Sequence, residues 1–120
     1  MHRRALVGAA LGLVAWRAQA AVSALEAARI DRLIEYVGSQ SQVKFVRNGR
    51  AYSSKEAAMF LRAKFDKMGE HVSTAQQFIE QIATGSSTSG KAYLIRFGDG
   101  RTVPAAQFLG AELERMDRKP

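Results

Sequence analysis

The chain of 120 residues contains no cysteine. It therefore cannot form a disulfide framework, a thiolate zinc site or an iron–sulfur cluster, and it has no cysteine nucleophile. Its length suits one domain. Hydrophobic residues make up 47% of the chain and charged residues 24%, which is typical of a globular protein rather than a disordered one. We therefore expect the fold to be stabilised by an apolar core without covalent cross-links.

The first twenty residues have the pattern of a secretory signal peptide. The basic segment Met1-His2-Arg3-Arg4 precedes twelve uncharged, mostly apolar residues, 5–16, and the pattern ends in Ala18-Gln19-Ala20. This order predicts cleavage between Ala20 and Ala21. The apolar run is too short to span a bilayer, which takes about 20 such residues. The alternative interpretation is an uncleaved amphipathic anchor.

Two export routes fit this segment. The general secretory route is favoured, although Arg3 and Arg4 also loosely match a twin-arginine signal. Cleavage would remove Arg3, Arg4 and Arg17 and leave 15 basic and 11 acidic side chains, a net charge of +4. The sequence thus predicts a mildly basic domain over 21–120, periplasmic or secreted, with no membrane span after cleavage.

Four segments have helical periodicity. The first begins at Ser23, and its apolar face carries Ile30, Leu33, Ile34 and Val37, with Leu25 one turn earlier and Gly38 with Ser39 as the expected end. The second starts with a capping box formed by Ser53 and Glu56, and its apolar stripe contains Ala57, Leu61, Phe65 and Met68. We expect Arg62 and Asp66 to pair across one turn of this helix.

The other two helices follow a second box and a proline. Residues Ser73 to Gln76 predict a cap for a third helix that ends at Gly85. Pro104 is expected in the first turn of the last helix, where its missing N–H would have no partner in any case. Apolar residues at helical spacing then continue to Met116, and Glu114 and Arg118 are expected to pair.

Two hairpins complete the pattern. Asn48-Gly49 separates two short strand-like runs and favours a type I′ turn, and Gly98-Asp99-Gly100 turns the second hairpin. The expected order is α-ββ-αα-ββ-α. It corresponds to a small α+β domain with helices packed on short antiparallel hairpins, and it leaves open whether the hairpins share a sheet.

Several segments together resemble a known family. They include the runs 45–49, 61–64 and 74–79, and the most specific block is the serine-rich segment 86–96. These residues are similar to a bacterial family of small secreted proteins of unknown function, the one that includes the enterobacterial protein YfeK. The resemblance implies the compartment and the fold. It implies no catalytic residues and no cofactor.

Four arginines flank the two hairpin turns and form the first candidate binding surface: Arg47, Arg50, Arg96 and Arg101. If the hairpins lie side by side, these side chains would form one positive edge. Such an edge suits an anionic component of the cell envelope or an acidic envelope protein. Nucleic acid is not expected as a partner of an exported protein with this modest charge. The alternative is that the charges only solubilise and protect the strands.

The second candidate is the serine loop, which we define as residues 85–90. Its hydroxyls and its glycine-flanked backbone could hold an anion through Ser86, Ser87, Ser89 and Gly90. The alternative is that the serines only order the connection between a helix and a strand.

The leading functional hypothesis is a non-enzymatic binding or interaction module of the cell envelope. The alternative is a small hydrolase in which His71, the one histidine of 21–120, acts as base for a serine of the loop. A third hypothesis, a structural subunit, predicts an exposed apolar patch. One histidine without cysteine or an acidic calcium loop gives no basis for a metal site, and no cofactor is expected.

Overall fold

The computed structural model describes residues 22–118, and the predicted signal segment with its cleavage site at Ala20 and Ala21 lies outside them. The described elements follow in the order α2 (Ala24–Ser39), β1 (Lys44–Arg47), β2 (Arg50–Tyr52), α3 (Ser54–Met68), α4 (Ala75–Phe78), a π-helical turn η1 (Ile79–Ala83), β3 (Leu94–Arg96), β4 (Thr102–Pro104) and α5 (Ala105–Arg118). The predicted α+β class is confirmed. None of the helices within 22–118 combines the length and the apolar character that crossing a membrane requires.

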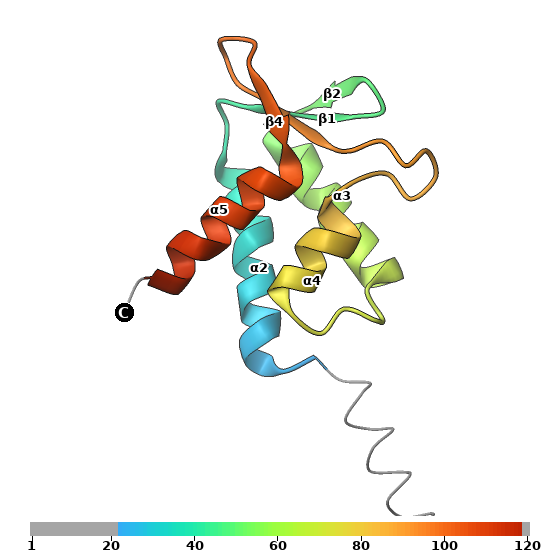
Figure 1. Ribbon diagram of the computed structural model, residues 1–120, viewed down its shortest axis with the longest axis vertical. Coiled ribbons are helices and arrows are strands. Elements are labelled where there is room, and N and C mark those ends of the chain that lie inside the picture. The colour runs from blue at the N-terminus through green and yellow to red at the C-terminus, as the bar shows by residue number, and fades with distance from the viewer. Residues whose placement is uncertain (1–21, 119–120) are drawn as a thin grey trace, which may run out of the picture.

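Both hairpins belong to one antiparallel sheet with the strand order β2-β1-β3-β4. Asn48 and Gly49 have φ angles of 51° and 81°, as a type I′ turn requires. Phe45 lies opposite Ile95 in the register, and Ile95 lies opposite Val103. These three side chains therefore share one face of the sheet, and the helices lie together on one side of it (Figure 1). Phe45 and Ile95 are buried there in the core.

Helix α2 supplies the centre of that core. The predicted face of Ile30, Leu33, Ile34 and Val37 is buried. The helix ends at Ser39, within the predicted stop of Gly38 and Ser39. Leu25 is 69% exposed, because the first turn of α2 extends past the neighbouring helices (Figure 1). The apolar stripe is therefore one turn shorter than its spacing predicts.

Helix α3 begins with the predicted capping box. The hydroxyl of Ser53 accepts a hydrogen bond from the Glu56 amide at 3.1 Å, and the Glu56 carboxylate accepts one from the Ser53 amide at 2.9 Å. Arg62 pairs with Asp31 of α2 at 2.8 Å rather than with Asp66, because α2 packs alongside α3. Met68, expected in the stripe, is 48% exposed on the last turn.

The third helix differs most from expectation. Its cap is Thr74, one residue after the predicted Ser73, and α4 is a single α-helical turn that continues as the π-helical turn η1. Glu26 of α2 accepts a hydrogen bond from the Ala75 amide at 2.8 Å, which fixes the start of α4. Pro104 ends β4 instead of entering α5; β4 is an edge strand, where a residue without an N–H is tolerated.

Candidate functional site

The predicted arginines lie at opposite ends of the sheet. Arg47 is in register with Arg50 beside the first turn, whereas Arg96 lies opposite Lys44. Arg101 is also at the far end, where its guanidinium lies 4.3 Å from the centre of the Phe97 ring. Antiparallel pairing brings the end of β3 to the start of β1. The four arginines therefore do not form one positive edge.

The serine loop lies at the Arg47 end. Ser89 donates a hydrogen bond from its hydroxyl to the Asn48 side chain in the first turn. The Ser86 hydroxyl accepts hydrogen bonds from the amides of Thr88 and Ser89, at 3.3 and 3.2 Å, and the Ser86 carbonyl accepts one from Gly90. Ser89 and Gly90 thus help to shape the loop, and three of the loop amides that could form an anion nest already donate hydrogen bonds within it.

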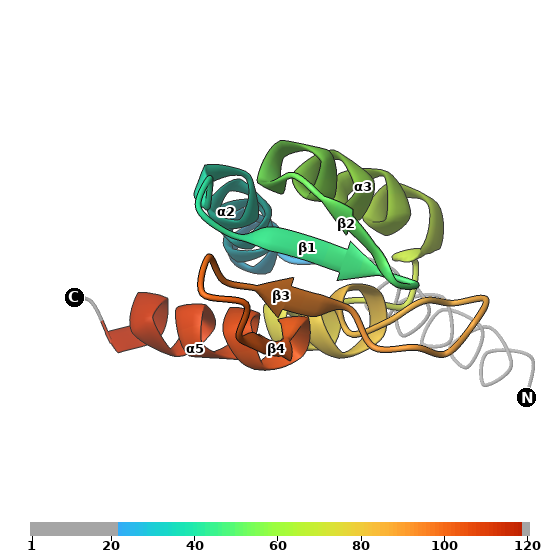
Figure 2. The ribbon, with the colours of Figure 1, turned by 90° about the horizontal axis from the view of Figure 1, so that it is seen from above.

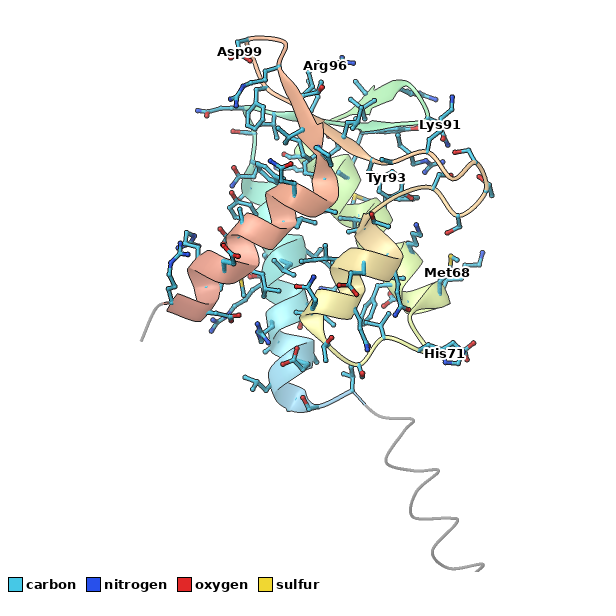
Figure 3. All side chains as sticks on the ribbon, viewed as in Figure 1. Met68, His71, Lys91, Tyr93, Arg96 and Asp99 are labelled. Carbon is cyan, nitrogen blue, oxygen red and sulfur yellow. The ribbon has the colours of Figure 1, made fainter. Side chains whose placement is uncertain are left out.

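A cationic groove of about 280 Å³ opens between α3 and the serine loop. We call it the Lys64 groove. Its cations and hydroxyls come from Arg47, Lys64, Lys67, Ser86, Ser87, Thr88 and Tyr93, and its apolar wall from Phe60, Ala63 and Met68. No carboxylate of the described residues lines it. In Figure 3, Tyr93 lies above Met68, and both residues line the groove.

Lys64 is the most unusual side chain of this groove, since it is a lysine with an exposed fraction of only 7%. Its Nζ donates hydrogen bonds to the carbonyl of Gly85 at 2.8 Å and to the hydroxyl of Tyr93 at 2.9 Å. An ammonium group has three donors, so one remains for another partner.

The positive charge of Lys64 is also not balanced by a neighbouring carboxylate of the described residues. Within residues 22–118 it forms no ion pair, whereas Arg29, Arg62 and Arg115 each pair with a carboxylate. Burial lowers the pKa of Lys64, and the nearby charge of Arg47 lowers it further. A buried charge without a counter-charge is costly for a fold. A bound anion would supply the missing charge and accept the free N–H.

Arg47 also lines the groove. Its guanidinium lies 4.4 Å from the centre of the Phe60 ring and 5.8 Å from that of Tyr52, so the rings hold its position. Among the described residues it too has no carboxylate partner. Burial raises the pKa of Tyr93, which keeps that hydroxyl neutral beside Lys64. The groove therefore holds two fixed cations and a neutral hydrogen-bonding hydroxyl.

A second cavity, of about 180 Å³, adjoins the groove between α3 and the sheet. Arg47, Phe60 and Tyr93 line both spaces. The rest of its wall is mostly apolar and consists of Phe45, Val46, Tyr52, Glu56, Ala57, Leu61, Ala83, Ala105 and Leu109. The Glu56 carboxylate is already engaged in the capping box. Figure 2 shows α3 running beside β2 and β1, and α3 and β1 contribute most of the residues of this wall.

Other predicted chemistry finds little geometric support. His71 is 87% exposed, and in Figure 3 it lies beyond Met68, further from the loop. Its one polar contact within 22–118 is Glu70 at 3.8 Å, so no hydroxyl of the serine loop is hydrogen-bonded to it. Glu112 is buried and paired with Arg115. No group of three metal-binding side chains occurs within the described part of the chain.

The burial of Lys64 could have been predicted from its position in the sequence. Lys64 follows Leu61 by three positions and Ala57 by seven, so it falls on the buried face of α3. A lysine in an apolar stripe is unusual, because lysine is rarely fully buried without a partner. Its pairing with Tyr93 depends on a contact between residues 29 positions apart, which spacing alone does not reveal.

Nearly all of the described residues match one known protein family. Residues 24–117 match the model of a family described as "Family of unknown function (DUF5329)". The chain belongs to the DUF5329 family. The resemblance seen in the serine-rich block and the neighbouring runs is thereby confirmed.

A curated relative supports this membership. The chain is 39% identical over 89 residues to the uncharacterized protein YfeK of Salmonella typhimurium, which covers 74% of this chain and 72% of the relative. No solved structure matches the chain. The DUF5329 family and this relative therefore assign no function, and the Lys64 groove is the basis for one.

Proposed function

We propose that this chain is an exported, non-enzymatic module that binds an anionic component of the cell envelope in the Lys64 groove. The observation that carries the proposal is the buried ammonium of Lys64, which has two neutral hydrogen-bond partners and no carboxylate partner within 22–118. A buried charge without a counter-charge lowers the stability of a fold, and a role in ligand binding would explain why the lysine is present.

The surrounding groups favour an anion over a cation or a neutral ligand. Arg47 and Lys67 line the same groove as Lys64, together with the hydroxyls of Ser86 and Ser87. Guanidinium and ammonium groups form their strongest hydrogen bonds with phosphate and carboxylate oxygens. Two of the serines predicted to bind a ligand thus remain in the proposed site, and so does Arg47.

The proposed export is supported by the first twenty residues. They contain a basic segment, an apolar run and small residues in the order typical of a signal peptide. Phosphate and carboxylate groups are abundant in the envelope that an exported protein meets. Fractionation of the native host tests this part. We expect the protein in the periplasm or the medium with Ala21 as its first residue, and an intact cytosolic chain would contradict export.

Arginine variants test the binding site. We expect Arg47→Ala to weaken salt-sensitive retention of the protein on anionic envelope fractions. Arg101→Ala is the matched control, because it removes the same charge at the opposite end of the sheet and should leave retention unchanged. Equal effects of the two substitutions would mean that retention reflects net charge and not the Lys64 groove.

A further inference from the structure

We infer that the ligand of the Lys64 groove is an amphipathic anion with a single linear alkyl tail. Its carboxylate or phosphate head would lie on Lys64, and its tail would enter the apolar cavity between α3 and the sheet. This inference rests on the proposed function, since it specifies the class of anion that the same site accepts.

The continuity of the two spaces is the first argument. Arg47, Phe60 and Tyr93 line both the groove and the cavity, so the two share a boundary. At that boundary the cation of Arg47 lies over the face of Phe60, 4.4 Å from its centre. A molecule that crosses it would meet charged groups on one side and apolar side chains on the other.

The lining of the cavity is the second argument. Leu61, Ala83, Ala105 and Leu109 contribute to its wall and are among the most buried residues of the described fold. They offer no side-chain hydrogen-bonding groups. Transfer of a hydroxyl or amide into such surroundings without a hydrogen bond costs about 1–3 kcal/mol in proteins, which disfavours a sugar or a peptide as the inserted group. An alkyl chain has no such penalty.

The size of the cavity sets the length of the tail. A dry apolar cavity of about 150 Å³ is large enough to hold benzene, which has six carbons. The cavity here measures about 180 Å³. A tail of about six to eight carbons would therefore fill it, and further carbons would remain outside.

A series of alkyl phosphates tests the inference by calorimetric titration of the full chain below the micelle concentration of each probe. The probes are inorganic phosphate and the butyl, octyl and dodecyl monoesters. We expect affinity to rise up to about fourfold for each methylene that is buried, and to level off beyond about eight carbons.

A cavity-filling variant locates the tail. Ala57→Leu adds bulk to the cavity wall and should retain phosphate binding while losing most of the preference for octyl over butyl phosphate. Ala111→Leu is the matched control, because Ala111 is exposed on α5 and lines neither space. Thermal unfolding monitors the fold, and Ala83→Val replaces Ala57→Leu if that variant is unfolded.

The outcomes separate the inference from the proposed function. Phosphate binding without any chain-length dependence would overturn the amphipathic ligand and leave anion binding intact. An octyl preference that survives in Ala57→Leu as fully as in Ala111→Leu would also overturn it, since the tail would then lie elsewhere. Absence of binding for every probe would refute both proposals.

Discussion

Replacement of Lys64 by methionine separates the charge of this residue from its bulk. Methionine has a similar length and is apolar, so Lys64→Met keeps the packing of α3 and removes the ammonium. If an anion binds at Lys64, the variant loses one hydrogen bond between charged groups. Such a bond contributes about 1.5–3 kcal/mol, which corresponds to a loss of affinity of about 10- to 150-fold.

Two control substitutions calibrate this loss. Lys67→Met removes an exposed cation of the same groove, and exposed pairs contribute at most about 1 kcal/mol, or about fivefold in affinity. Lys55→Met removes an exposed cation of the same helix that lines neither space and should change nothing. Calorimetric titration with phosphate at low ionic strength measures all three. Wild-type affinity in Lys64→Met would refute the reasoning.

The stability of the unliganded variant is equally informative. The buried ammonium gains two hydrogen bonds but loses its hydration, and these effects oppose each other. We therefore expect the free energy of unfolding of Lys64→Met to stay within about 1 kcal/mol of the wild-type value. Phosphate at one hundred times its dissociation constant should stabilise the wild-type protein by about 2.7 kcal/mol, and the variant by much less. A large loss without ligand would indicate a purely structural lysine.

The lowered pKa of Lys64 predicts a characteristic dependence of stability on pH. Its pKa in the folded state is lowered, chiefly by burial. Between that value and the unfolded value of about 10.4, the unfolded chain binds more protons, so stability rises with pH in this range. Urea denaturation on the alkaline side of neutrality should show this rise in the wild-type protein and not in Lys64→Met. Parallel curves for the two proteins would contradict an unpaired buried charge.

The remaining predictions concern the fold. Glu26→Ala removes a carboxylate that caps α4 and should cost about 2 kcal/mol in urea denaturation at neutral pH; Glu35→Ala, exposed on the same helix, should cost much less. Because that hydrogen bond lowers the pKa of Glu26, the stabilisation by Glu26 is present above about pH 4.3 and is lost as the pH falls through the pKa of the folded state. A stability difference between wild type and Glu26→Ala that stays constant in acid would contradict this. Gly110→Ala should raise stability by about 0.5–1 kcal/mol, since nothing lies within 4 Å of the added methyl, and a loss would contradict it. Gly69→Ala should destabilise, since its methyl would lie 2.5 Å from the carbonyl oxygen of Phe65, and an unchanged melting temperature would show that the helix end adjusts.

Local signals predicted the fold where neighbours in sequence decide the structure. The Asn48-Gly49 turn and the box of Ser53 and Glu56 involve residues at most three apart, and both are present as predicted. The start of the third helix was misplaced by one residue. There Glu26, 49 positions earlier, accepts from the Ala75 amide, and no local pattern contains that contact.

The site was harder to predict for the same reason. Sequence pattern identified Arg47 and the serine loop, which lie near each other, but it grouped them with Arg96 and Arg101 at the far end. That grouping depended on how the two hairpins pair, which is a long-range property. The burial of Lys64 follows from helical spacing, whereas its lack of a carboxylate partner within 22–118 depends on how α3, the serine loop and Tyr93 come together.

The most direct test of anion binding in the Lys64 groove is a phosphate titration of the isotopically labelled protein. Nuclear magnetic resonance would monitor the backbone amide and lysine side-chain signals at each phosphate concentration. Anion binding in the Lys64 groove predicts saturable shifts centred on Lys64, Tyr93 and the serine loop, with the Arg96 and Arg101 end of the sheet unchanged. Shifts that fail to saturate, or that centre on Arg96 and Arg101, would contradict it.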